Sequence, residues 1–318
     1  MALYVNTNVT SLRGQASLNK ASNSLATTYN RLSTGLRINS AKDDAAGLQI
    51  SDRLTSQING LNQGNRNAND GIALTQTVEG AMDEMTTMLQ RIRTLSVQAA
   101  NGTNTTNDRA SIQAEVTSLS QEITRIACKT TYAGKTVLSG FDDASKSIVG
   151  SGNEAKVKFQ VGANTDDTLE LNLQLKNLDK NTNDYSLSSL MKSANVANFA
   201  TGKAVTDSMA FYTEGNNVVF NVSGSKAAQA TLACIDDVIN VIDSKRGDFG
   251  ALQNRMESTI SNQTNIANNE TDARSRIRDT DYATEASNLS AQSIVQQAAS
   301  SMLTQANSLP QLALSLLG

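Results

Sequence analysis

The clearest hydrophobic repeat in the chain lies at its two ends. Near the carboxyl terminus, apolar and small residues follow one another at four-three spacing: Val295, Ala299, Met302, Ala306, Leu309, Ala313 and Leu316. Near the amino terminus, Leu18, Leu25 and Leu32 recur every seven residues. Such spacing places side chains on one face of a helix that packs against another helix. The pattern predicts two helical arms that pack on each other or on neighbouring copies.

Two long helical patterns lie between these arms. Apolar residues at helical spacing predict one helix from about residue 44 to 99 and, after a short turn, a second helix over residues 112–126. The turn folds the second helix back antiparallel on the first, with Asn107 or Asp108 as its N-cap. The helical pattern returns over residues 232–266 and continues toward the carboxyl-terminal arm.

Between the helical stretches, hydrophobic residues alternate with polar ones. This alternation predicts half-buried strands over residues 157–161 and 169–175, joined by a hairpin turn at 163–167, and a further strand at 218–222. The expected fold is therefore mostly α with a β insert. It consists of a long antiparallel helical hairpin or coiled-coil rod, terminal helical arms and a central segment rich in β-hairpins.

The composition favours a structural protein over an enzyme. Aromatic residues make up only 4% of the 318 residues, and the chain has no His and a single proline. Few large rings argue against one large globular core. The absence of His removes the commonest general base and the commonest metal ligand. We expect no catalytic site, no cofactor and no metal site.

Charge is distributed unevenly, although the net charge of −3 is too balanced to indicate nucleic acid as a partner. The first 42 residues contain five basic side chains and no acid, and no charged residue follows Glu285. A basic amphipathic arm is compatible with binding at a membrane surface. We favour instead contact with the acidic residues at 279–285, because the arms carry few bulky anchors. No apolar stretch is long enough for stable membrane insertion.

Several long motifs resemble bacterial flagellin. They are Arg31-Leu-Ser-Thr-Gly-Leu-Arg-Ile-Asn-Ser-Ala-Lys-Asp-Asp-Ala-Ala-Gly47, Asn65-Arg-Asn-Ala-Asn-Asp-Gly71, Phe159-Gln-Val-Gly-Ala-Asn164, Ser275-Arg-Ile-Arg-Asp-Thr-Asp-Tyr-Ala-Thr-Glu285 and Leu309-Pro-Gln-Leu-Ala-Leu-Ser-Leu-Leu317. The resemblance covers roughly residues 1–177 and 230–318 and keeps the motifs in order. The segment between these two ranges is expected to be the part that varies within the family.

The resemblance implies a structural subunit that polymerises into the extracellular flagellar filament used for swimming. It also implies unfolded export through the flagellar type III apparatus. This changes the expectation of a cytosolic protein, which follows from the absence of a signal-peptide pattern. Implied partners are other copies of the chain in a helical homopolymer, the flagellar export chaperone, and cap and junction proteins. The alternative within the superfamily is the hook–filament junction protein, which shares the terminal arms.

The family's organisation implies three parts. Residues 1–43 and 275–318 form the inner core of helical arms, residues 44–177 and 230–274 form the helical rod with its β-hairpin, and residues 178–229 form a variable, surface-exposed segment. The arms cannot bury their apolar faces alone, so we expect them to be disordered in the free chain and to fold on assembly.

Within the arms, we assign inner-core packing to Leu18, Leu25, Leu32, Val295, Ala299, Met302, Ala306 and Leu309. The residues on the face opposite this seam are candidates for lining an export channel: Gln292, Gln296, Ser300, Thr304 and Asn307. A polar face without charge would not trap a passing unfolded chain of either sign. The other interpretation is that these are solvated positions on a packed helix.

Two further features concern the rod. Gln90, Arg91 and Leu95, with Glu115 on the returning helix, resemble the patch by which a vertebrate Toll-like receptor binds many flagellins. Contact between protofilaments is the preferred interpretation of the same residues. Cys128 and Cys234 are expected near opposite ends of a helix of roughly 30 Å. Because a disulfide needs Cα atoms within about 7 Å, we predict two separate thiols.

Overall fold

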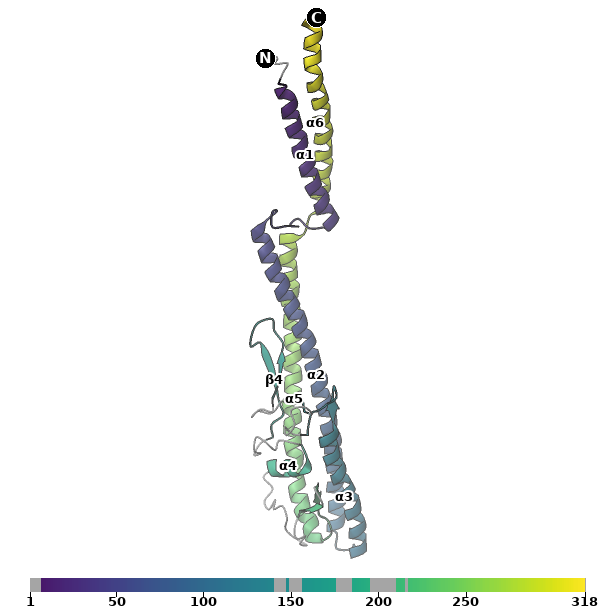
Figure 1. Ribbon diagram of the computed structural model, residues 1–318. Helices are drawn as coiled ribbons and strands as arrows, with labels where there is room; N and C mark the ends of the chain where they lie inside the picture. The colour runs from purple at the N-terminus through teal and green to yellow at the C-terminus, as the bar shows by residue number, and fades with distance from the viewer. Residues whose placement is uncertain are drawn as a thin grey trace. The chain divides into compact units, whose positions relative to one another are not determined.

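The structure is a computed structural model that describes residues 7–139, 147–148, 156–175, 185–194, 210–214 and 217–317 (Figure 1). Contacts between residues divide the chain into two compact units. Unit 1 combines residues 1–59 with 265–318, and unit 2 consists of residues 60–264. Each unit is described by itself below.

Unit 1 is built around a pair of terminal helices, α1 (Val9–Thr34) and α6 (Tyr282–Leu317), which lie side by side (Figure 1). The side chain of Asn8 caps the start of α1. Gly35 ends α1 with a left-handed φ of 71°, the conformation that favours glycine at a helix end. At the start of α6, the carboxylate of Asp281 accepts hydrogen bonds from the backbone N–H groups of Ala283 and Thr284.

Unit 2 contains most of α2 (Ala45–Ala100) and α5 (Ser225–Arg278), together with α3 (Thr106–Lys129). The hydrophobic core of the protein lies in this unit. Its α2 residues follow helical spacing and include Val78, Met82, Met85, Leu89, Ile92 and Leu95. This stripe confirms the apolar pattern that predicted the long helix.

The start of α3 differs from the predicted cap. Thr105 is the N-cap: its hydroxyl accepts a hydrogen bond from the backbone N–H of Asp108, while the carboxylate of Asp108 accepts one from the backbone N–H of Thr105. This reciprocal arrangement satisfies two backbone donors at once. Hydrogen bonds donated to the Asp108 carboxylate by the Thr105 hydroxyl, which is the larger cause, and by the Thr105 backbone N–H lower the pKa of Asp108.

Three antiparallel hairpins accompany the helices. They pair β1 (Thr131–Tyr132) with β2 (Lys135–Thr136), β3 (Lys156–Gln160) with β4 (Thr168–Asn172), and β5 (Phe211–Glu214) with β6 (Asn217–Phe220). In the second hairpin Phe159 faces Leu169 across the pair. The predicted strand at 169–175 is shorter than expected, but Leu173 and Leu175 beyond it are buried.

Glycine in α2 allows the β3–β4 hairpin to approach the helices closely. A Cβ at Gly64 would lie 1.8 Å from the carbonyl oxygen of Val161, so only glycine fits there. The same carbonyl accepts a hydrogen bond of 2.6 Å from the side-chain amide of Gln263 on α5. The hairpin is therefore held against both α2 and α5 by its Val161 carbonyl.

The segment 178–229 differs from the expected surface-exposed part. It contributes the short helix α4 (Leu187–Ser193), and its described residues include several that are fully buried: Leu187, Leu190, Met191, Val219 and Phe220. Val218, Val219 and Phe220 are all buried in succession, so β6 is covered on both faces and does not follow simple alternation. Sequence that lacks the family motifs thus still completes the core.

With that correction, the predicted fold class is confirmed: the chain is mostly helical, with antiparallel helices and a β insert. None of the helices that the structure describes is both long and apolar enough to span a membrane.

Gly64→Ala should displace the hairpin, because the new Cβ meets the Val161 carbonyl carbon and oxygen. Displacing this carbonyl also breaks its bond to Gln263, and we expect a loss of about 1–3 kcal/mol of unfolding free energy in denaturant titration. Gly80→Ala is the matched control, since nothing lies within 4 Å of a Cβ at that position in the same helix. The control should be neutral or slightly stabilising. Equal stability of the two variants would contradict this account of hairpin docking.

Candidate assembly site on the terminal helices

Polar contacts fix the register of α1 against α6. The side-chain amide of Asn8 donates a hydrogen bond of 2.7 Å to the carbonyl oxygen of Ala306. Farther along α1, Ser22 accepts a hydrogen bond of 3.3 Å from Gln296. Near the end of α1, Arg31 lies 4.0 Å from Glu285. Residue numbers fall along α6 as they rise along α1, so the two helices are antiparallel.

Main-chain hydrogen bonds tie the segments next to these helices together. The N–H of Arg37 donates to the carbonyl oxygen of Arg278 at 2.7 Å, and the N–H of Thr280 donates to that of Gly35 at 3.0 Å. The guanidinium of Arg37 donates to the carbonyl of Ile277. The bonded residues all lie within the motifs at 31–47 and 275–285, so these motifs supply the connection within unit 1.

The buried surface of the helix pair is small. Among the described side chains of α1 and α6, the buried ones are Ala21, Thr28, Glu285 and Ala306. Small residues bring the backbones close, and a Cβ at Gly14 would lie 3.3 Å from the Leu303 side chain. Small contacts bury little apolar area, so each contributes little to stability.

Several large apolar side chains of the pair are exposed. Ile294 is 65% exposed, Val295 54% and Met302 69%, and on α1 both Leu12 and Tyr29 are more than half exposed. Isolated exposed apolar residues are common on soluble proteins, but a cluster along one helix is typical of an interaction surface. These two helices carry a surface suited to further contacts.

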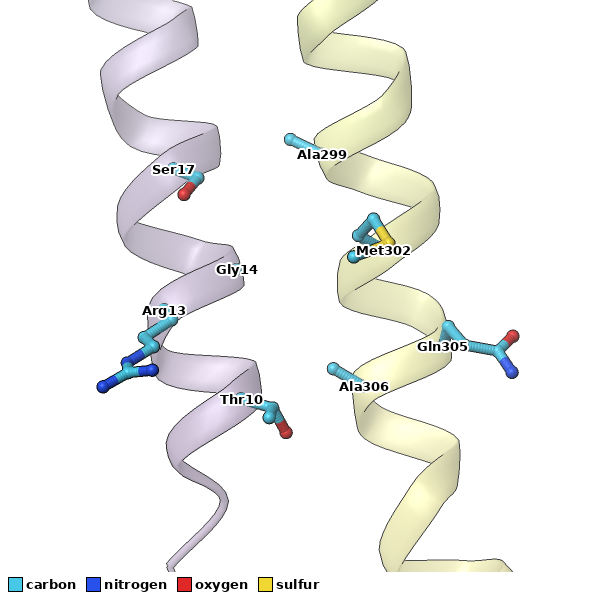
Figure 2. Close-up of a pocket in the computed structure, with 8 residues that line it drawn as sticks. All are labelled: Thr10, Arg13, Gly14, Ser17, Ala299, Met302, Gln305 and Ala306. Carbon is cyan, nitrogen blue, oxygen red and sulfur yellow. The ribbon is translucent and has the colours of Figure 1, made fainter. Parts of the chain in front are cut away.

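A hollow opens between α1 and α6 beside this surface. It has a volume of about 400 Å³ and is lined by Thr10, Arg13, Gly14, Ser17, Ala299, Met302, Gln305 and Ala306. Figure 2 shows Ala299, Met302 and Ala306 on the side of α6 that faces α1, while the Arg13 and Gln305 side chains extend away. The small residues on both helices leave this space unfilled.

The predicted inner-core residues divide into two sets. Leu18, Leu25, Leu32 and Ala299 are half-buried, and Ala306 is buried. Val295 and Met302 are exposed, although Met302 also lines the hollow between the helices. The side chain of Leu309 lies outside the described residues. The four-three pattern thus contains small residues that are covered by the pair and large residues that are left exposed.

The predicted channel-facing residues also divide. Gln296 bonds to Ser22, Asn307 accepts a hydrogen bond of 2.6 Å from the Ser11 hydroxyl, and Gln292 is half-buried. The expectation that Gln292, Gln296 and Asn307 lie opposite the helix pairing does not hold within this chain. Ser300 and Thr304 are exposed.

The receptor-like patch is partly buried. The guanidinium of Arg91 donates hydrogen bonds of 2.9 and 2.7 Å to a Glu115 carboxylate oxygen, and both side chains are about half exposed. Gln90 is exposed beside them. Leu95, however, is only 3% exposed and belongs to the core, because it continues the buried stripe of α2. Leu95 therefore cannot contact a partner at the protein surface.

The two cysteines are half-buried and are not joined by a disulfide. Burial, with a smaller contribution from the charge of Asp237, raises the pKa of the Cys234 thiol. A raised pKa keeps the thiol protonated at neutral pH and lowers its reactivity. Within the described residues, no group of three or more Cys, Asp or Glu side chains could hold a metal ion.

Sequence reasoning missed Asn8, which both caps α1 and bonds to α6. The available signal was an Asn immediately before the helical pattern. It also placed no specific partner on Arg31, although the acidic stretch 279–285 was expected to meet the basic arm. Of its three acids, Glu285 lies near Arg31, while Asp279 and Asp281 accept local hydrogen bonds from Ser275 and Thr284.

Comparison with known families matches residues 5–143 to the bacterial flagellin N-terminal helical region and residues 232–317 to the bacterial flagellin C-terminal helical region. The chain is 38% identical to flagellin D of Vibrio anguillarum and 37% identical to flagellin D of Vibrio cholerae. Both alignments cover 100% of this chain and of the relative.

Among solved structures, a flagellar hook-associated protein from Vibrio parahaemolyticus matches with a TM-score of 0.51 at 14% identity. The match covers 74% of this chain and 100% of that one. At this identity the likeness concerns the fold alone.

Asn8 offers a test of the register between the helices. Asn8→Ala removes both the cap and the bond to Ala306, and we expect the start of α1 to lose about 1–2 kcal/mol of stability against local opening. Asn8→Ser is the matched control, because serine can cap but is too short to reach α6. Hydrogen exchange at residues 9–20 should increase most in the alanine variant and by a smaller amount in the serine variant. Unchanged exchange in both variants would contradict the proposed contact.

Proposed function

We propose that this chain, which belongs to the bacterial flagellin family and is a structural subunit of the flagellar filament, is exported unfolded by the flagellar type III apparatus and serves swimming from outside the cell. The full-length likeness to flagellins is the observation that carries the proposal. The full-length relatives are flagellins, so the hook–filament junction alternative rests on a shared fold alone. We assign the chain a structural role and no catalytic one.

The terminal helices are proposed to provide the contacts between copies. Ile294, Val295 and Met302 are apolar, exposed in the single chain and close in sequence on one helix. A head-to-tail contact that does not close on itself produces a helical filament. Burial of these side chains against other copies would extend the small interface between α1 and α6 into a complete core.

The small interface between α1 and α6 also affects the arms before assembly. A pair of helices that buries few large side chains has little to offset the entropy of ordering them. We propose that the α1–α6 pair opens readily in the free chain and becomes stable when other copies cover it. Easy opening also suits a chain that must be exported unfolded.

The charge-free surface of α6 is proposed to face the export channel through Ser300 and Thr304. These two hydroxyl side chains are exposed, and the Thr304 hydroxyl donates to the Ser300 carbonyl oxygen within α6. Hydroxyl groups are polar without carrying charge, so they would not hold a passing chain electrostatically. A filament reconstruction that buries both residues against a neighbouring copy would contradict this assignment.

Other partners are proposed from the family resemblance. The export chaperone is proposed to bind the carboxyl-terminal arm, and cap and junction proteins to meet the same ends of the subunit. Gln90, Arg91 and Glu115 form an exposed polar patch that could serve contacts between protofilaments and binding by a host Toll-like receptor. Charge reversal at Arg91, assayed for both filament formation and receptor signalling, would separate those two roles.

Met302→Ser tests the assembly surface. Met302 is 69% exposed, so the substitution should leave the free chain's circular dichroism unchanged. Loss of one buried apolar side chain at a contact costs roughly 1.5–3 kcal/mol, which corresponds to at least about a tenfold higher critical concentration for polymerisation. Thr304→Ser is the matched control, because it retains the hydroxyl on the same helix. A critical concentration unchanged by Met302→Ser would count against burial of this surface between copies.

A further inference from the structure

The turn between α2 and α3 contains Asn101 followed by Gly102. We propose that Asn101 is a site of spontaneous covalent modification in the folded protein. Its side chain cyclises onto the backbone nitrogen of Gly102, and water then opens the ring to give aspartate or isoaspartate. The proposal concerns the chemistry of the folded chain and does not depend on export or filament formation.

The reaction needs only the chain itself and water. The backbone nitrogen of Gly102 attacks the side-chain amide carbon of Asn101, forming a new C–N bond. The original C–N bond of the side chain breaks, and its nitrogen leaves as ammonia with the proton from the Gly102 N–H. Water then adds to one of the two carbonyl carbons of the succinimide ring and breaks its bond to the ring nitrogen. No atom changes its oxidation state overall, so no oxidant or reductant is needed.

The geometry of the turn favours the attack. The side-chain oxygen of Asn101 accepts a hydrogen bond of 3.5 Å from the backbone N–H of Thr103, which folds the side chain back along the main chain past Gly102. All three residues are exposed. Nothing lies within 4 Å of where a Cβ of Gly102 would be, so the attacking nitrogen is uncrowded. In this described turn, the Gly102 N–H makes no hydrogen bond.

A second Asn-Gly pair, Asn59-Gly60, can be compared with Asn101-Gly102 in the same chain. This pair lies in the interior of α2, where the N–H of each residue donates to the carbonyl four residues earlier. A Cβ at Gly60 would lie 2.7 Å from that of Ala163, so the site is also covered by the hairpin. The same dipeptide must therefore wait for local opening of the helix before it can react.

The two products should affect the turn differently. Arg109 donates hydrogen bonds of 3.0 Å to the Ala99 carbonyl and 3.1 Å to the Asn101 carbonyl, and so holds the end of α2. Aspartate at position 101 keeps the main chain and places a carboxylate near this guanidinium. Isoaspartate lengthens the main chain by one carbon and moves the carbonyl that Arg109 binds. Only the isoaspartate form should loosen the turn.

The test is to incubate the purified full chain in mildly alkaline buffer, with a parallel sample in urea. Trypsin releases the two sites in separate peptides, residues 94–109 and 54–66, and fragment mass spectra locate each deamidated Asn. We expect Asn101 to react at a similar rate in the folded and unfolded chains. Asn59 should react at least about tenfold more slowly when folded. It can react only in the small fraction of chains in which the helix is open, and a modest opening free energy makes that fraction less than about a tenth.

Gly102→Ala is the matched variant, since a Cβ fits in open space and the fold should not change. The added methyl group hinders attack by the neighbouring nitrogen, and Asn101 should then react several-fold more slowly, with Asn59 unaffected. Folded-state protection of Asn101 equal to that of Asn59 would overturn the proposal. So would a rate at Asn101 that Gly102→Ala leaves unchanged, because cyclisation would then not be the route.

Discussion

The antiparallel register between α1 and α6 is the constraint on which the arrangement of unit 1 depends. It is set by polar contacts at both ends of the pair, from Asn8 with Ala306 to Arg31 with Glu285. Each such hydrogen bond, and an ion pair as long as 4.0 Å, contributes little free energy, but these contacts are directional. They determine which residues face each other and therefore which apolar side chains are left outside.

The two units differ in the kind of contact that stabilises them. In unit 2 the core consists of large side chains such as Met82, Leu89 and Phe249, all of which are almost completely buried. Such packing is sufficient for a stable unit without a partner. In unit 1 the small residues Gly14, Ser17 and Ala306 line the hollow between the helices, and Ile294, Val295 and Met302 are exposed. We therefore propose that unit 2 folds by itself and that contact with other copies completes unit 1.

The sequence predicted the fold where one physical signal dominated. Helical spacing gave the long helices, because an apolar stripe such as Val78 to Leu95 can be buried only along one helix face. Alternation of apolar and polar residues identified the β3–β4 hairpin, because a half-buried strand covers every second side chain. In the segment 178–229, the strand predicted at 218–222 corresponds to β6, whereas α4 was not predicted because it is too short to show a periodic stripe.

The candidate site was predicted less well than the fold. The four-three repeat on α6 was read as one seam, although Ala299 and Ala306 are half-buried or buried while Val295 and Met302 stay more than half exposed. Spacing identifies an apolar helix but does not say where one contact face ends and another begins, because small and large residues count equally in the pattern. The face that Gln296 occupies was assigned wrongly for this reason, since its bond to Ser22 depends on the register.

We propose that contacts with other copies complete the terminal helices. Hydrogen exchange of residues 9–34 and 282–308, compared between the free chain and the assembled filament, tests it most directly. We predict fast exchange in the free chain, strong protection in the filament, and little change in the α2 core around Met82 to Leu89. Equal protection of the terminal helices in both states would show that the pair is complete by itself and would contradict the account.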